Sequence, residues 1–123
     1  MPTTPWLLGV AAIGEAVTGL ALVAVPDLVG RLLLGVEVGG VGLVIARVTG
    51  IALLALGLGC WLGRREGGRS SALTAMLAYD AMVSAYLVAL GLGTEFVGVL
   101  LWPAAAVHAV LTALLGRAWI KRQ

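Results

Sequence analysis

The stretch GLVIARVTGIALLALGLGCWLG, residues 42–63, is apolar almost throughout, although Arg47 lies inside it. A helix that spans a membrane needs about 20 consecutive, mostly apolar residues. The stretch has this length, and it therefore predicts a membrane-spanning helix. A permanent charge at the bilayer centre costs about 2.5–3.5 kcal/mol on the most lenient scale. We therefore expect Arg47 to face partners within the protein rather than lipid.

The composition of the whole chain points to the same class of protein. Of its 123 residues, 61% are hydrophobic and 11% are charged, whereas soluble domains average about 45–50% apolar and about 25% charged residues. A soluble protein of this composition would lack the polar groups to cover its surface. The basic residues stand near the ends of apolar runs, so no nucleic-acid-binding patch is expected. The single cysteine, Cys60, excludes an intrachain disulfide, and we expect a small buried thiol.

Four apolar runs follow one another along the chain, at about residues 5–25, 41–63, 71–93 and 96–116. Backbone groups in hydrocarbon must satisfy their own hydrogen bonds, so we expect helices rather than an open sheet. The leader MPTTPW carries no basic residue, which predicts a retained first helix rather than a cleaved signal peptide. The sequence thus predicts an all-α fold, with residues 1–123 forming a single transmembrane domain built as a left-handed four-helix bundle.

The connection between the first two runs is more than a plain loop. Pro26 and Asp27 suit the start of a helix, and the Asp27 carboxylate can accept hydrogen bonds from free backbone N–H groups there. LVGRLLLGVE, residues 28–37, then predicts a short interfacial helix on the outer surface, with Arg31 and Glu37 facing the lipid headgroups. A lid over a cavity that opens outward is the alternative interpretation.

The charges that flank the runs predict the orientation in the membrane. Four spans put both termini and the 64–70 loop on one side, which carries Arg64, Arg65, Arg69, Arg117, Lys121 and Arg122. The opposite side carries Arg31 with the acids Asp27, Glu37 and Glu95. Because cytoplasmic segments are rich in Lys and Arg, both termini are expected in the cytoplasm. Trp6, Trp61 and Trp119 fall at the same boundary, where aromatic side chains favour the interface. Seven arginines against one lysine suggest a bacterium with a GC-rich genome, and so the bacterial inner membrane.

Each apolar run contains one ionisable residue away from its ends, and these are Glu15, Arg47, Asp80 and His108. At about 1.5 Å per residue, Glu15, Asp80 and His108 are predicted near the membrane midplane. Arg47 is predicted about 9 Å from the outer edge. Four such groups facing lipid would be very costly. We therefore expect them to face one another, with Arg47 held by one or both acids.

Two interpretations of these four residues stay open. One is a structural polar network that fixes helix register. The other is a functional site, because ionisable residues within a membrane are usually functional. Tyr79, Tyr86 and Trp102 are candidates to line the same cavity. Pro103, beside Trp102, predicts a kink or a late helix start, where a pocket could open.

Two further kinds of site are disfavoured. Glu15, Asp80 and His108 offer three metal ligands, but their spacing has no metal-site signature. The charge of Arg47 would also repel the ion, so no metal is expected. Ser84 and His108 do not indicate a hydrolase, because no nucleophile elbow surrounds the serine. An intramembrane enzyme is therefore the least favoured function, and no catalytic residue is assigned.

Two segments carry a family resemblance. LLALGLGCWL, residues 53–62, and FVGVLLWPAAAVHAVL, residues 96–111, resemble segments of small bacterial four-helix membrane proteins of the DoxX-like kind. The resemblance spans the whole chain and implies the four-helix fold. Some DoxX proteins are associated with quinone-linked oxidoreductase complexes, so the resemblance is compatible with a quinone. It carries over no catalytic residue.

The sequence leaves two functions open. In the first, the protein binds or transports a small amphipathic molecule (a quinone or a lipid) or protons. Its ligand-binding residues are then Glu15, Arg47, Asp80, His108, Tyr79 and Trp102. In the second, the protein is a structural or accessory subunit of a larger membrane complex. The expected partners are the lipid bilayer, a hydrophobic small molecule, and a membrane protein or a second copy of the chain. No resident cofactor is expected, although a quinone fits the first function.

Overall fold

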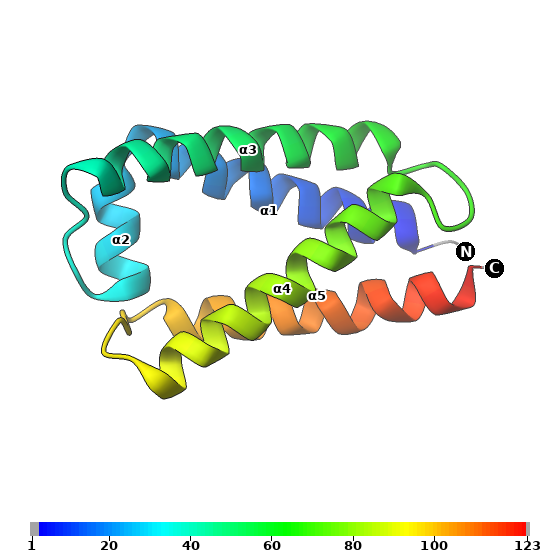
Figure 1. Ribbon diagram of the computed structural model, residues 1–123. Coiled ribbons are helices and arrows are strands. Elements are labelled where there is room, and N and C mark those ends of the chain that lie inside the picture. Colours follow the sequence, from blue (N-terminus) through cyan, green and yellow to red (C-terminus); the bar gives the residue numbers. More distant parts are fainter. Residues whose placement is uncertain (1–2, 123) are drawn as a thin grey trace.

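The computed structural model describes residues 3–122, and all the regular structure in this part of the chain is helical. The helices are α1 (Thr4–Ala24), α2 (Pro26–Leu34), α3 (Val41–Gly63), α4 (Ser71–Gly93) and α5 (Leu101–Lys121) (Figure 1). All but α2 are long and apolar enough to cross a membrane. The prediction of an all-α chain with four such helices is confirmed, and it suggests a membrane protein.

The helix bounds follow the apolar runs with one exception. The predicted ranges 41–63 and 71–93 match α3 and α4, and α1 lies one residue from its prediction. The fourth helix begins at Leu101 rather than near residue 96. Pro103 therefore lies in the first turn of α5, where a missing N–H leaves no helical hydrogen bond unmade. The late helix start is confirmed.

The short helix α2 lies between α1 and α3 in the chain, at the end of the molecule far from the termini (Figure 1). Pro26 opens it as predicted, but the capping role predicted for Asp27 is wrong. The Asp27 carboxylate instead accepts hydrogen bonds from Arg31, at 2.5 Å, and from the backbone N–H of Val38, at 3.2 Å. The carbonyls of Leu32 and Leu33 accept hydrogen bonds from the α4–α5 loop, at 2.8 and 2.9 Å. The free carbonyls at the end of α2 are thus partly satisfied by that loop.

The long helices form two pairs. α1 packs mainly against α3, and α4 packs mainly against α5 (Figure 1). Small residues permit the close approach of α1 and α3. A Cβ added at Gly57 would lie 2.8 Å from the carbonyl oxygen of Ala12 and 3.2 Å from the Cβ of Ala16. The α1–α3 contact therefore depends on the absence of a side chain at Gly57.

The two pairs meet in an apolar core to which all four long helices contribute. Its buried members are Leu8, Ala11, Ala12, Cys60, Ala72, Leu73, Met76 and Leu115. The predicted burial of Cys60 is confirmed, since the residue is 2% exposed. A second, smaller core joins α4 and α5 near α2, with Leu87, Leu101 and Ala105 as its buried members. The outer faces carry many exposed apolar side chains, which suits contact with lipid.

Replacing Gly57 by Ala tests the close packing of α1 and α3. We expect Gly57→Ala to lower the free energy of unfolding by about 1–3 kcal/mol, because the added methyl group overpacks the interface. Gly59→Ala is the matched control on the same helix, since a Cβ at Gly59 meets nothing within 4 Å. Thermal unfolding in detergent, followed by circular dichroism, measures both variants. Equal melting temperatures would contradict the tight contact.

Candidate functional site

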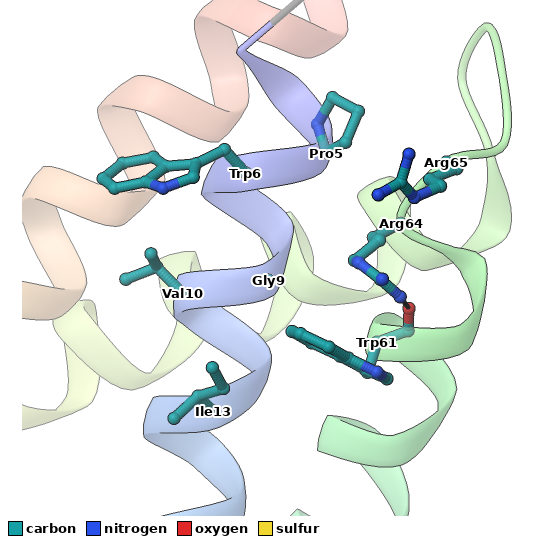
Figure 2. A pocket seen from close by; sticks show the side chains of 8 residues that line it. All are labelled: Pro5, Trp6, Gly9, Val10, Ile13, Trp61, Arg64 and Arg65. Atoms are coloured by element: carbon teal, nitrogen blue, oxygen red, sulfur yellow. Dashed lines mark hydrogen bonds between the residues drawn. The ribbon is translucent and has the colours of Figure 1, made fainter.

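Functional side chains gather in two places in the structure. One is a hollow of about 520 Å³ beside α1 and the end of α3, shown in Figure 2. It is lined by Pro5, Trp6, Gly9, Val10, Ile13, Trp61, Arg64 and Arg65. None of the predicted ligand-binding residues lines it. Sequence reasoning assigned its tryptophans and arginines only to the membrane boundary.

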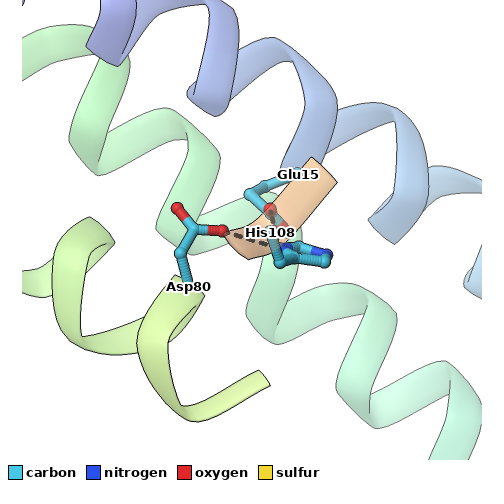
Figure 3. Close-up of side chains that lie close together, drawn as sticks. All are labelled: Glu15, Asp80 and His108. Atoms are coloured by element: carbon cyan, nitrogen blue, oxygen red, sulfur yellow. Dashed lines mark hydrogen bonds and ion pairs between the residues drawn. The ribbon is translucent and has the colours of Figure 1, made fainter. Parts of the chain in front are cut away.

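The second place is a cluster of Glu15, Asp80 and His108, which we call the polar cluster (Figure 3). α1 contributes the glutamate, α4 the aspartate and α5 the histidine. Each residue lies well inside its helix, as their predicted depth requires. The prediction that these three side chains face one another is confirmed, and the contact spans both helix pairs.

The imidazole of His108 lies between the two acids. Its Nδ1 is 2.6 Å from Oδ1 of Asp80 and 3.9 Å from Oε1 of Glu15. The 2.6 Å contact is a short hydrogen bond between the imidazole and the Asp80 carboxyl group. A single ring nitrogen therefore faces both carboxyl groups.

The three side chains of the polar cluster are largely buried. Asp80 is fully buried, Glu15 is 4% exposed, and the His108 side chain is 17% exposed. Within residues 3–122, Oδ2 of Asp80 has no hydrogen-bond partner. Burying an unpaired polar atom is costly, and native proteins rarely leave one without a reason. Asp80 therefore has spare capacity to bind a proton or a cation.

Of the three aromatic candidates, Tyr86 is 65% exposed, and Tyr79 and Trp102 have different positions. The Tyr79 ring meets the His108 ring edge-on, with 5.9 Å between the ring centroids and 76° between the planes. Tyr79 therefore borders the polar cluster as predicted. The Trp102 indole packs against Gly91 of α4, where an added Cβ would overlap the indole ring. Trp102 contacts α4 nearly two turns away from His108 along α5, outside the polar cluster.

Arg47 has a different role from the one predicted. Its Nε donates a hydrogen bond to the carbonyl oxygen of Val23, at 3.2 Å. Val23 lies in the last turn of α1, where carbonyl groups lack helical partners and the helix dipole is negative. Among the described residues, Arg47 forms no ion pair with Glu15 or Asp80. The predicted pairing is therefore wrong. Arg47 instead donates a hydrogen bond to a carbonyl group at the end of α1.

The position of Arg47 also removes one argument against a metal ion. One ligand atom from each member of the polar cluster lies within 4.8 Å of the other two. The three side chains could together hold a metal ion, because carboxylate oxygens and imidazole nitrogens are common ligands. The positive charge expected to repel the ion is engaged at the end of α1.

No family model, curated protein or solved structure matches this chain. The resemblance to the DoxX-like proteins therefore stays a prediction, and the function is argued from the geometry.

The single histidine makes the polar cluster easy to observe. We expect Asp80→Asn to shift the ring ¹⁵N NMR signals of His108, because Nδ1 loses its carboxyl partner. Arg47→Gln should leave these signals unchanged, because Arg47 bonds to Val23 instead. Both variants are measured with ¹⁵N-histidine labelling in detergent micelles. A large shift of these signals in Arg47→Gln would contradict this prediction and would support the pairing of Arg47 with the acids.

Proposed function

We propose that this chain is a small integral membrane protein whose polar cluster binds a cation within the membrane and passes it across, and that the cation is the proton. The observation that supports this proposal is the position of His108 Nδ1, which faces both Asp80 and Glu15 in a buried site. When Nδ1 carries a proton, it can pass this proton to Asp80 across the 2.6 Å contact, and Nδ1 can then take up a proton from Glu15, which lies 3.9 Å away.

Charge balance gives the physical reason for proton binding. With both carboxyls ionised and the imidazole neutral, the polar cluster would carry two negative charges in an apolar interior. Buried charges are stable only when they are compensated. Arg47 of α3 does not compensate the two carboxylates, because its side chain bonds to the Val23 carbonyl at the end of α1. Two bound protons, one on His108 and one on an acid, make the polar cluster neutral.

A divalent metal ion is the second candidate, because one such ion would neutralise the same two carboxylates. The distances within 4.8 Å between ligand atoms favour it. The accessory-subunit and quinone proposals rest on weaker support, namely the exposed apolar faces and the family resemblance. Copurification of a partner protein or a quinone after mild solubilisation would support these alternatives.

Proton movement is the direct test of the proposed function. Liposomes that contain the protein and a pH-sensitive dye are given an external acid pulse. We expect the interior to acidify faster than in empty liposomes, and Glu15→Gln to abolish this difference because glutamine does not bind a proton. Glu95→Gln, which changes an exposed acid in the α4–α5 loop, should behave as the unmodified protein.

Failure of the proton proposal has a clear signature. If liposomes with the unmodified protein acidify no faster than empty ones, the polar cluster does not conduct protons. Titration with Zn²⁺ or Mn²⁺ then tests the second candidate. Binding of one ion per chain that is lost in Asp80→Asn would identify a metal site.

We further propose a bacterial inner-membrane location with both termini in the cytoplasm. Arg122, near the C-terminus, donates hydrogen bonds to the carbonyls of Glu66 and Gly68, at 3.0 and 3.3 Å. The α3–α4 turn and the C-terminal end therefore lie together, as four spans require. The concentration of basic residues at this end supports a cytoplasmic position.

Cysteine labelling tests this topology. In a Cys60→Ser background, we expect an impermeant maleimide to label Glu37→Cys on intact cells that lack an outer membrane. Gly67→Cys should be labelled only after permeabilisation, because the α3–α4 turn is expected on the cytoplasmic side. Both positions are exposed, so accessibility within the fold does not decide the result. The reverse pattern would invert the topology.

A further inference from the structure

A groove runs along the outer side of α1 and α3, away from the polar cluster. Its first part is the hollow of about 520 Å³ in Figure 2, which includes Arg64 and Arg65. A second hollow of about 410 Å³ follows it toward the middle of the helices. The two parts share Ile13 and Trp61 in their linings, so they form one continuous surface.

The two parts of the groove differ in chemistry. The inner part is lined by apolar residues alone, among them Ala12, Ala16, Gly57 and Leu58. These small side chains leave room beside the tightly packed α1–α3 pair. The other part ends at two arginines, and its lining contains no acid. The groove is therefore apolar along its length and positive at one end.

The positive end is partly fixed in place. The Arg64 guanidinium lies 3.9 Å from the centroid of the Trp61 ring and donates a hydrogen bond to the Trp61 carbonyl, at 2.5 Å. Arg65 has no hydrogen-bond or ion-pair partner in the part of the chain that the structure describes. Figure 2 shows both arginines at the end of the groove that Pro5 lines, with the Arg64 guanidinium turned toward Trp61. Arg65 is thus free to bind an anion there.

We propose that this groove binds an anionic phospholipid. The acyl chain lies along the apolar part, and the phosphate lies at Arg64 and Arg65. Charge complementarity selects the headgroup, because each Arg near a membrane surface contributes about 1 kcal/mol toward anionic lipids. Trp6 and Trp61 stand near the ends of α1 and α3, at the predicted membrane boundary, where amphipathic rings are stable. This site is independent of the polar cluster and of the proton proposal.

A lipid titration tests the headgroup preference. The protein in mild detergent is titrated with dioleoyl-phosphatidylglycerol or with dioleoyl-phosphatidylcholine, and native mass spectrometry counts the bound lipid. We expect the anionic lipid to bind in preference, and Arg65→Gln to weaken its binding about fivefold. Arg117→Gln is the charge-matched control, since Arg117 is exposed at the same end of the molecule but does not line the groove. It should leave anionic binding unchanged.

A second pair of variants tests the apolar part. Ile13 lines both hollows and is 54% exposed, so Ile13→Trp fills the groove without entering the core. It should reduce binding of both lipids. Val17→Trp, also on the exposed side of α1 but outside both linings, should not.

Three results would each overturn the proposal. The first is equal binding of the two lipids by the unmodified protein. The second is an equal loss of binding in Arg65→Gln and Arg117→Gln, which would mean that only overall charge matters. The third is unchanged binding in Ile13→Trp. Circular dichroism of every variant separates these results from a loss of fold.

Discussion

The cost of placing ionisable groups in an apolar medium governs this structure. Four long helices offer few polar groups to one another, and each carries one ionisable side chain away from its ends. Three of these side chains, Glu15, Asp80 and His108, meet where the two helix pairs come together. Because the polar cluster has members in both pairs, a change in the contact between the pairs would leave a buried carboxyl without its partner.

The two apolar cores support this arrangement from either side. Along α4, Asp80 lies between Met76 of one core and Leu87 of the other. Along α5, His108 lies between Ala105 and Leu115 in the same way. The polar cluster therefore lies between two apolar layers, one on either side of it along the helices. Such apolar surroundings strengthen every electrostatic contact inside the polar cluster.

The sequence predicted the features that depend on one helix at a time. Length and apolar composition gave the bounds of α3 and α4, and Pro103 gave the late start of α5. Counting residues along each apolar run predicted that Glu15, Asp80 and His108 lie at the same depth in the membrane. The error with Arg47 has a physical cause, because depth does not say which backbone groups of a neighbouring helix remain unpaired. The Val23 carbonyl that binds Arg47 becomes visible only once α1 and α3 are placed side by side.

The two proposed sites share a single helix. Glu15 directs its carboxyl from α1 toward α4 and α5, whereas Ile13 and Ala16 line the groove beside α3. Successive residues of an α-helix are separated by about 100°, so these neighbours lie on different faces of α1. The close contact at Gly57 holds α1 against α3, while the polar cluster and the shared apolar core hold it against the second pair. A lipid in the groove would therefore contact the same helix that carries Glu15.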